Sequence, residues 1–404
     1  MGGLLPGMNA KKALIIVSVL LVLSLGSLLV YNYFFKSASP GAETANNGAL
    51  PSAPAGRDTG TGGTGTLPGG NGNQTGQSQA NLKIRPISKE PVLSPTIGED
   101  GQTVKYYARA NGHIWESDFL GANLKKISAV TLTGLIKAVW SPDKGKVIGI
   151  FSDNNKIKKY FYDYDKNQSA LLDENVGYVA WSPDSKKIAY QFIDPASGQN
   201  NISAANPDGT NWKNIFKTRL DNLIVEWPGS NKISLRQPPS GLAQGILYAI
   251  NSATGDFNKI LSDIYGLSVK WSPKADKILY SSTDDRGRNP KLTLSDETGA
   301  NSKDLKLAGI ADKCVWSKDD RTIFCALPQE PSPNAIWPDD YYKGLVILSD
   351  DFYKINLETG DKTKILGSSG QAGYDAQELF LSPKEDYLFF INKRDGLLYG
   401  LKTQ

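Results

Sequence analysis

Five oxygen-bearing side chains between residues 163 and 174 have the spacing of a calcium-binding loop. Oxygen ligands at positions 1, 3, 5, 7 and 12 of such a loop can surround Ca²⁺, and these positions are held by Asp163, Asp165, Asn167, Ser169 and Glu174. Position 6 of the loop needs a glycine for its sharp turn, but here it is Gln168. The segment KKYFYDYDKNQSALLDE carries no helical pattern. We therefore predict two strands joined by a turn, and no metal site.

The two cysteines are the second candidate for chemistry. Cys314 and Cys325 flank the segment CVWSKDDRTIFC, and a hairpin that turns at Asp319 and Asp320 would place them opposite each other. In an oxidising compartment this arrangement favours a disulfide; two buried free thiols are the alternative. The only histidine of the chain, His113, is far from both in sequence. Neither a catalytic cysteine nor a Cys/His zinc cluster is therefore expected.

Charge and motif content exclude further classes of function. Lys plus Arg number 45 and Asp plus Glu number 41, which gives a formal net charge of +4. These charges are interspersed, whereas nucleic-acid-binding domains gather basic residues on one face. Carboxylates are numerous, but their spacing assigns no pair to acid/base roles. The sequence predicts no nucleic-acid partner, no cofactor and no catalytic residue.

A tryptophan motif recurs through the last four-fifths of the chain. Its copies are AVWSPDKGKVIGIF from residue 138, VAWSPDSKKIAYQF from 179, VEWPGSNKISLR from 225, VKWSPKADKILYSS from 269 and CVWSKDDRTIFCAL from 314. Successive tryptophans lie 41, 46, 44 and 45 residues apart, at Trp140, Trp181, Trp227, Trp271 and Trp316. Two degenerate copies have Leu93 and Leu381 in place of the tryptophan. This period is typical of one four-stranded sheet per repeat.

Each copy has the pattern of a β-hairpin. A short strand ends in Trp-Ser, a turn of Pro, Asp, Lys, Gly or Ser follows, and an alternating strand comes next. We expect the tryptophan to fill the space between neighbouring sheets. The sequence thus predicts an all-β protein in which residues 81–404 form a β-propeller. We expect seven four-stranded blades, with six or eight as alternatives.

The last repeat supplies only three strands, which we place at residues 378–382, 387–392 and 396–402. The segment NLKIRPIS, residues 81–88, alternates like a strand and precedes the first full repeat. An open propeller would leave unpaired strand edges. We therefore predict that residues 81–88 supply the missing strand and close the ring.

The WSPD-type repeats resemble the WD40-like propeller repeats of the TolB family of bacterial periplasmic proteins, over essentially all of residues 81–404. The family's usual turn is WSPDG, and here other residues replace its glycine, such as Lys144 after Asp143 and Ser185 after Asp184. The resemblance implies a propeller, usually of six blades. It does not specify function, because the same fold serves as a scaffold, a partner-binding platform or a gating domain.

The sixth repeat carries an insertion. It runs for 65 residues, from Ser317 to Ser382, and the excess lies in LPQEPSPNAIWPDDYYKG. After the second strand of the blade, this loop would project from one end of the ring with the candidate binding residues Trp337, Asp339, Asp340, Tyr341 and Tyr342. Aromatic side chains beside fixed acids can recognise a peptide or a glycan. Alternatively, the loop folds back to plug the ring or cover a blade.

The first 80 residues predict an anchor and a tether. Residues 13–35 carry no charge and are long enough to span a bilayer as a helix. Lys11 and Lys12 precede this segment and only Lys36 follows it, which favours a short cytoplasmic tail at residues 1–12. A cleaved signal peptide is the alternative. Residues 37–80 are rich in Gly, Ser, Thr, Asn and Pro, contain no aromatic residue, and are expected to form a flexible linker.

Two functions fit this organisation. In the first, a single-pass membrane protein displays the propeller in the periplasm or at the cell surface and binds a protein partner of the cell envelope; a glycan partner also fits. In the second, an extracytoplasmic hydrolase or lyase acts on a glycan or a peptide with carboxylates near the propeller axis. A cavity at the axis that holds carboxylates with perturbed pKa values would favour the second.

Overall fold

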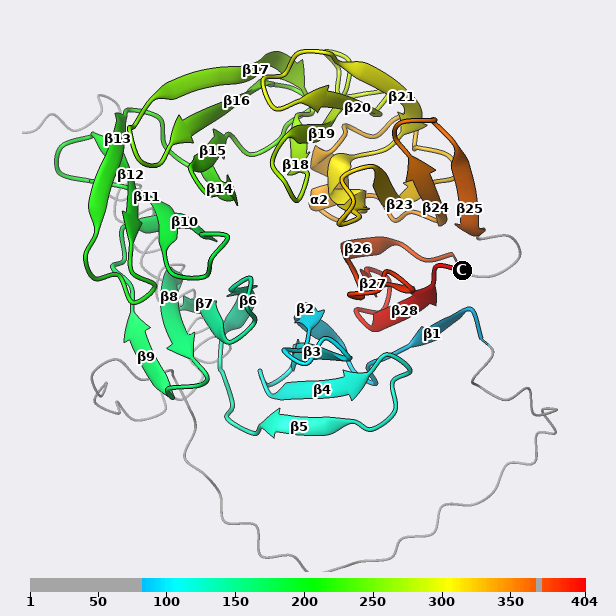
Figure 1. Cartoon of the computed structure of the whole chain (residues 1–404), viewed down its shortest axis with the longest axis horizontal. Coiled ribbons are helices and arrows are strands. Elements are labelled where there is room, and N and C mark those ends of the chain that lie inside the picture. The colour runs from blue at the N-terminus through cyan, green and yellow to red at the C-terminus, as the bar shows by residue number, and fades with distance from the viewer. Residues whose placement is uncertain (1–81, 368–372) are drawn as a thin grey trace, which may run out of the picture. The chain divides into compact units, whose positions relative to one another are not determined.

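A computed structural model describes residues 82–367 and 373–404, which form seven four-stranded antiparallel sheets arranged as the blades of a propeller (Figure 1). This architecture confirms the prediction of an all-β protein with seven blades. Helical structure in the described residues is limited to the 3-10 turn η2 (Ala311–Lys313) and the short helix α2 (Asp339–Tyr342). None of the described helices is long and apolar enough to cross a membrane. The predicted anchor at residues 13–35 and linker at residues 37–80 lie outside the described residues.

The strands follow one another along the chain, blade by blade, from the inner strand to the outer one. Blades 1 and 2 contain β2 (Val92–Ile97), β3 (Thr103–Ala108), β4 (Ile114–Asp118), β5 (Lys125–Ser128), β6 (Leu135–Trp140), β7 (Lys146–Asp153), β8 (Lys156–Asp163) and β9 (Gln168–Leu171). Blades 3 and 4 contain β10 (Val176–Trp181), β11 (Ile188–Phe192), β12 (Asn200–Ala205), β13 (Lys213–Thr218), β14 (Ile224–Gly229), β15 (Lys232–Arg236), β16 (Gln244–Asn251) and β17 (Phe257–Tyr265). Blades 5 and 6 contain β18 (Ser268–Trp271), β19 (Lys277–Ser282), β20 (Lys291–Asp296), β21 (Lys303–Ala308), β22 (Cys314–Trp316), β23 (Thr322–Pro328), β24 (Asp350–Asn356) and β25 (Lys362–Leu366). Blade 7 contains β26 (Ala376–Leu381), β27 (Tyr387–Asn392), β28 (Leu398–Lys402) and β1 (Ile84–Pro86).

The motif tryptophans join neighbouring blades. Trp181 and Trp316 are only 6% and 7% exposed. Their indole N–H groups donate to the inner strand of the preceding blade, at 2.8 Å to the Val139 carbonyl and 3.1 Å to the Lys270 carbonyl. Apolar burial and a satisfied indole N–H act together at these two blade boundaries, whereas the Trp227 indole N–H donates to Ser230 within its own blade. This is the core position between blades expected from the sequence.

The segment at residues 81–88 closes the ring as predicted. β1 pairs antiparallel with β28, with Ile84 opposite Leu401 and Pro86 opposite Tyr399. The pairing continues past the strand through a 2.7 Å hydrogen bond from the Ile87 amide to the Leu398 carbonyl. The N-terminal strand is thus the outer strand of the last blade.

The hairpins predicted around the cysteines and around Asp163 are both present. Cys314 and Cys325 lie opposite each other in β22 and β23 and are joined by a disulfide. Both are almost fully buried, at 1% and 0% exposure. The calcium-like segment forms β8, a tight turn and β9, with Asp163 opposite Gln168.

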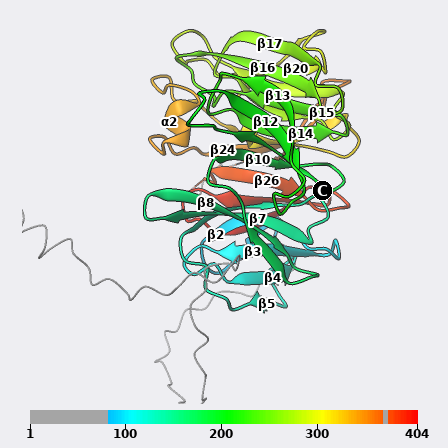
Figure 2. The ribbon, with the colours of Figure 1, turned by 90° about the vertical axis from the view of Figure 1, so that its left-hand side faces the viewer.

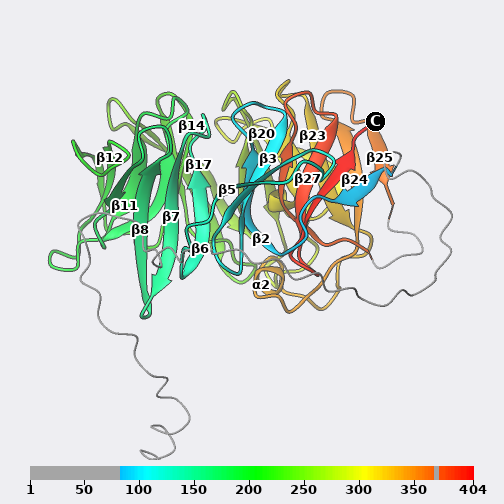
Figure 3. The ribbon, with the colours of Figure 1, turned by 90° about the horizontal axis from the view of Figure 1, so that it is seen from below.

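The two ends of the ring carry different connections, because adjacent strands are antiparallel. The motif turns and the third-to-fourth-strand connections lie at one end, here called the turn face. The second-to-third-strand connections and the crossings between blades lie at the other. We call this end the insertion face, because the long connection at residues 329–349, with α2, projects from it (Figures 2 and 3).

Candidate functional site

The insertion at residues 329–349 lies folded over the insertion face. The Trp337 amide donates to the Gly287 carbonyl of blade 5 at 2.6 Å. The Asp339 carboxylate accepts the Gly241 amide of blade 4 at 2.7 Å. On the return path, Arg394 of blade 7 donates to the Leu348 carbonyl at 2.8 Å. The insertion therefore leaves blade 6 and is fastened to blades 4, 5 and 7.

All five candidate binding residues make contacts that hold the insertion in place. Trp337 and Tyr341 are 1% and 4% exposed and pack in an apolar cluster with Ile310, Ala335, Val346 and Leu348. Asp339 binds blade 4, and the Asp340 carboxylate accepts the Ile336 amide at 2.8 Å. Tyr342 is 44% exposed, but its hydroxyl donates to the Asp312 carboxylate of η2. The structure thus places the loop back on the ring, because burial of large aromatic side chains stabilises that arrangement.

A buried ion cluster fixes the base of the insertion. The Lys313 ammonium lies 2.8 Å from the Asp350 carboxylate and 2.9 Å from the Asp375 carboxylate, and all three side chains are at most 1% exposed. Asp350 follows the insertion at the start of β24, and Asp375 precedes β26. The second oxygen of Asp375 accepts the Leu348 amide at 2.9 Å. The cluster therefore ties the insertion to both blades 6 and 7.

The pKa values in this cluster reflect burial and pairing. Burial raises the pKa of Asp350, and Lys313 only partly offsets this rise. For Lys313, burial alone would lower the pKa, but Asp350, Tyr341 and Asp375 together raise it above its usual value. Fixed acceptors surround the Lys313 ammonium, so we assign this cluster a structural role.

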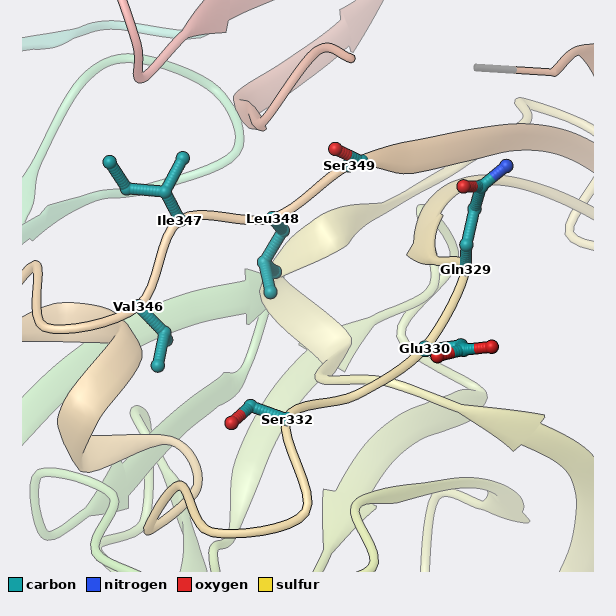
Figure 4. A pocket seen from close by; sticks show the side chains of 7 residues that line it. All are labelled: Gln329, Glu330, Ser332, Val346, Ile347, Leu348 and Ser349. Atoms are coloured by element: carbon teal, nitrogen blue, oxygen red, sulfur yellow. The ribbon is translucent and has the colours of Figure 1, made fainter. Parts of the chain in front are cut away.

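The two legs of the insertion enclose a small cleft of about 410 Å³ (Figure 4). Gln329, Glu330 and Ser332 line it from the segment that follows β23. Val346 to Ser349 line it from the segment that precedes β24. Leu348 is buried at 4% exposure, whereas Ile347 is 61% exposed. The cleft is a gap within a fastened loop and contains one exposed apolar side chain.

Charged side chains of both signs act on one another around the axis. Lys137, Lys270 and Glu378 come from inner strands, whereas Arg236 ends β15, Arg109 follows β3 and Asp312 lies in η2. Glu378 of β26 has a raised pKa: its side chain is exposed, but desolvation by the surrounding protein outweighs the opposing effect of Lys137 of β6, Arg109 and Lys270 of β18. For Asp312, burial alone would raise the pKa, but Lys270 and Arg236 lower it below its usual value. Acids and bases from blades 1, 2, 4, 5, 6 and 7 therefore influence one another at the axis.

An apolar groove of about 630 Å³ opens between blades 2 and 3 on the insertion face. Four large side chains in its lining are unusually exposed, namely Ile136 (48%), Ile157 (46%), Tyr178 (45%) and Ile193 (38%). Val139, Ile150, Val176 and Val179 add to the apolar lining. Its charged residues are Lys137, Lys156, Lys159 and Glu174. The groove is therefore an apolar surface with an excess of positive charge.

Sequence reasoning missed this groove for a local reason. The register of β6 shifts between Leu135 and Lys137, and that of β10 shifts between Val176 and Val179. Such bulges interrupt the two-residue alternation of a strand and redirect side chains. Ile136 and Tyr178 lie within these shifts, so their exposure does not follow from the sequence pattern. The run KIKKYF, with Ile157 between two lysines, is the only signal that the sequence offers.

Exposed apolar side chains are concentrated at the insertion face. The described residues include 16 exposed large hydrophobic side chains. Eleven lie at or near the insertion face, by their place in the strands and connections: Val130, Ile136, Ile157, Leu171, Tyr178, Ile193, Leu220, Leu242, Tyr342, Leu345 and Ile347. The turn-face end carries Leu82, Leu120, Trp212 and Phe257. Contiguous exposed apolar surface marks interaction sites in soluble domains.

In residues 82–367 and 373–404, no group of three or more His, Cys, Asp or Glu side chains is placed to hold a metal ion. The segment with calcium-loop spacing forms a hairpin and lies outside any such group.

No protein-family model and no curated protein matches this sequence. Solved structures share its fold. An oligogalacturonate lyase in complex with manganese is 11% identical, with a TM-score of 0.57 over 80% of this chain and 93% of that chain. An oligogalacturonate lyase from Vibrio parahaemolyticus is also 11% identical, with a TM-score of 0.54 and the same coverage. Putative TolB from Agrobacterium tumefaciens is 18% identical, with a TM-score of 0.41 over 56% of this chain and 88% of that chain.

These comparisons and the seven blades define the class: the chain is a β-propeller protein. TolB from Acinetobacter baumannii is also among the similar structures, at 12% identity and a TM-score of 0.38. Identities of 11% to 18% describe a shared fold and assign no activity.

Proposed function

We propose that this chain is a protein-binding platform of the cell envelope and that it binds its partner through the insertion face. The observation that carries this proposal is the apolar groove between blades 2 and 3, with four large side chains between 38% and 48% exposed. Exposing such side chains to water is unfavourable, by about 25 cal/mol per Å² of apolar surface. A partner that covers them would remove this cost.

Two features support an extracytoplasmic location, with the N-terminus in the cytoplasm. Residues 13–35 have the length and composition of a membrane-spanning helix. Cys314 and Cys325 form a disulfide, and disulfides persist in oxidising compartments and are rare in the cytosol.

The test is site-specific photocrosslinking in intact cells that make the full chain. A photoreactive phenylalanine analogue replaces Ile193, at the groove, or Leu120, on the turn face. These side chains are similarly exposed, at 38% and 41%. We expect a discrete crosslinked protein from position 193 and none from position 120. No product from position 193, or the same product from both, contradicts the proposal.

One observation favours a second candidate function, an extracytoplasmic hydrolase or lyase that acts on a glycan or a peptide with carboxylates at the axis. Desolvation by the surrounding protein raises the pKa of the exposed Glu378 carboxylate against the electrostatic effect of three basic side chains, and perturbed carboxylates are enriched in active sites. Two of the similar structures are oligogalacturonate lyases, so oligogalacturonate is the first substrate to test. Turnover by the full chain that is lost in Glu378→Gln would support this function. No turnover of oligogalacturonate, other glycans or peptides would leave the platform as the better explanation.

A further inference from the structure

We propose that the groove between blades 2 and 3 binds a short apolar segment of a partner protein that carries at least one acidic side chain. This inference rests on the proposed function and names the chemistry of its partner. It follows from the shape, lining and charge of the groove.

The size of the groove suits a peptide segment. Its volume of about 630 Å³ lies within the range of about 300–1,000 Å³ in which pockets enclose most of a small ligand. The lining comes from both blades, with Ile150 and Ile157 from blade 2 and Val179 and Ile193 from blade 3. Side chains from two rigid sheets form an apolar site that exists before the partner arrives, which reduces the entropy cost of binding.

The charges select an acidic partner. Three lysines line the groove against one carboxylate, Glu174. Lys156 lies 3.7 Å from Glu174, but these side chains are 73% and 75% exposed, so their attraction is weak. Lys137 and Lys159 form no ion pair within 4.0 Å with any described carboxylate, although Lys137 acts electrostatically on Glu378 and Lys159 donates to the Val176 carbonyl at 2.6 Å. A carboxylate from the partner would supply a counter-charge at contact distance.

The surroundings of Lys159 strengthen this argument. Burial lowers the pKa of its ammonium group below the usual value of 10.5. An amine in partly desolvated surroundings interacts more strongly with an opposite charge than one in bulk water does. An acidic side chain of the partner that lies near Lys159 therefore contributes more to the free energy of binding than an ion pair on the exposed surface does.

The experiment begins with peptide selection on the full chain, held in nanodiscs of phosphatidylcholine. A phage library of random 12-residue peptides is the probe. We expect the selected peptides to share two or more large apolar residues and at least one Asp or Glu. Synthetic copies, and analogues with Gln or Lys at the acidic position, are then measured by fluorescence anisotropy.

Groove variants assign the site. Ile157→Asp should weaken binding at least tenfold, whereas the matched control Leu120→Asp, on the turn face, should not change it; the two side chains are 46% and 41% exposed. The double variant Lys137→Glu/Lys156→Glu should weaken the acidic peptide and strengthen its lysine analogue. All these positions are at the surface, and equal thermal melting of the variants checks that they fold.

Three outcomes overturn the inference. They are selection of peptides without acidic residues, equal affinity for acidic and Gln peptides, or binding that Ile157→Asp does not weaken. Binding of phosphatidylglycerol vesicles in place of any peptide would identify the groove as a lipid-binding surface and also overturn it. If crosslinking at position 193 succeeds while the peptide results fail, the platform stands and only the partner chemistry is wrong. If crosslinking also fails, both proposals fall.

Discussion

At the scale of single residues, contacts between blades explain why some motif turns carry another residue where the TolB-family turn has glycine. The position that follows Pro-Asp in the TolB-family turn adopts a left-handed conformation here, with φ of 67° at Lys144 and 60° at Ser185. Glycine would adopt it without strain. However, the Ser185 hydroxyl accepts the Asp143 amide of the preceding blade at 3.0 Å. Asp320 does the same for the Lys274 amide at 3.1 Å. A side chain here joins two blades, which glycine cannot do.

A pair of substitutions separates strain from hydrogen bonding at Ser185. Ser185→Ala removes the contact between blades and keeps the left-handed strain, so we expect a loss of about 1 kcal/mol in the free energy of unfolding. Ser185→Gly removes the same contact but relieves a strain of about 1–2 kcal/mol. The glycine variant should therefore be the more stable of the two. Urea denaturation measures both, and the reverse order would show that the turn conformation is not strained.

The acidic residue of the same turn predicts a pH dependence. A hydrogen bond from the Ser182 hydroxyl is the main cause that lowers the pKa of Asp184 from its usual 3.8. Because the folded state binds this proton less tightly than the unfolded state, Asp184 stabilises the fold above about pH 4. That stability is lost as the pH falls through the lowered pKa. Asp184→Asn should therefore show a shallower decrease in melting temperature between pH 5 and pH 2.5. An unchanged slope would argue against a stabilising role.

At the scale of elements, the insertion depends on one buried cation. Lys313→Met would leave the Asp350 and Asp375 carboxylates, both fully buried, without a counter-charge. Breaking a buried ion pair in this way costs about 3–5 kcal/mol. We expect such a loss in urea denaturation, with partial recovery when Asp350→Asn and Asp375→Asn are added. A loss below about 1 kcal/mol would show that the cluster does not hold the insertion.

The disulfide in blade 6 provides a second prediction for an element. Cys314 and Cys325 are 11 residues apart in sequence, and closing a loop of this size stabilises a fold by about 2–3 kcal/mol. The double variant Cys314→Ala/Cys325→Ala should lose about this amount in chemical denaturation. Because both cysteines are at most 1% exposed, a reducing agent should not break the bond until the protein unfolds. Rapid reduction under native conditions would contradict this placement.

At the scale of the whole molecule, repetition made the fold predictable. The spacing from Trp140 to Trp316 predicts the blade period, and the missing fourth strand in the last repeat predicts a closing strand. The position of the insertion depends on partners remote in sequence, because Trp337 contacts Gly287 and Asp339 contacts Gly241. The groove depends on bulges that no residue pattern marks. Local sequence therefore predicts the blades, while contacts between blades decide the candidate site.

The closing strand can be tested against the predicted linker. Deleting residues 82–88 removes β1 and leaves the edge of β28 unpaired, so the melting temperature should fall by many degrees. Deleting residues 41–76 shortens the predicted linker and should leave the melting temperature unchanged. Equal melting of the two variants would show that β1 does not stabilise the ring.

The pairing of β1 with β28 also sets when the domain can be completed. Ser88 accepts the Leu398 amide across a sequence separation of 310 residues. The first strand of the propeller therefore remains without its partner until β28 has been made. Six blades can assemble in order during synthesis, but the seventh must wait for β28. Synthesis of β28, and not of any earlier blade, is the event that permits the ring to close.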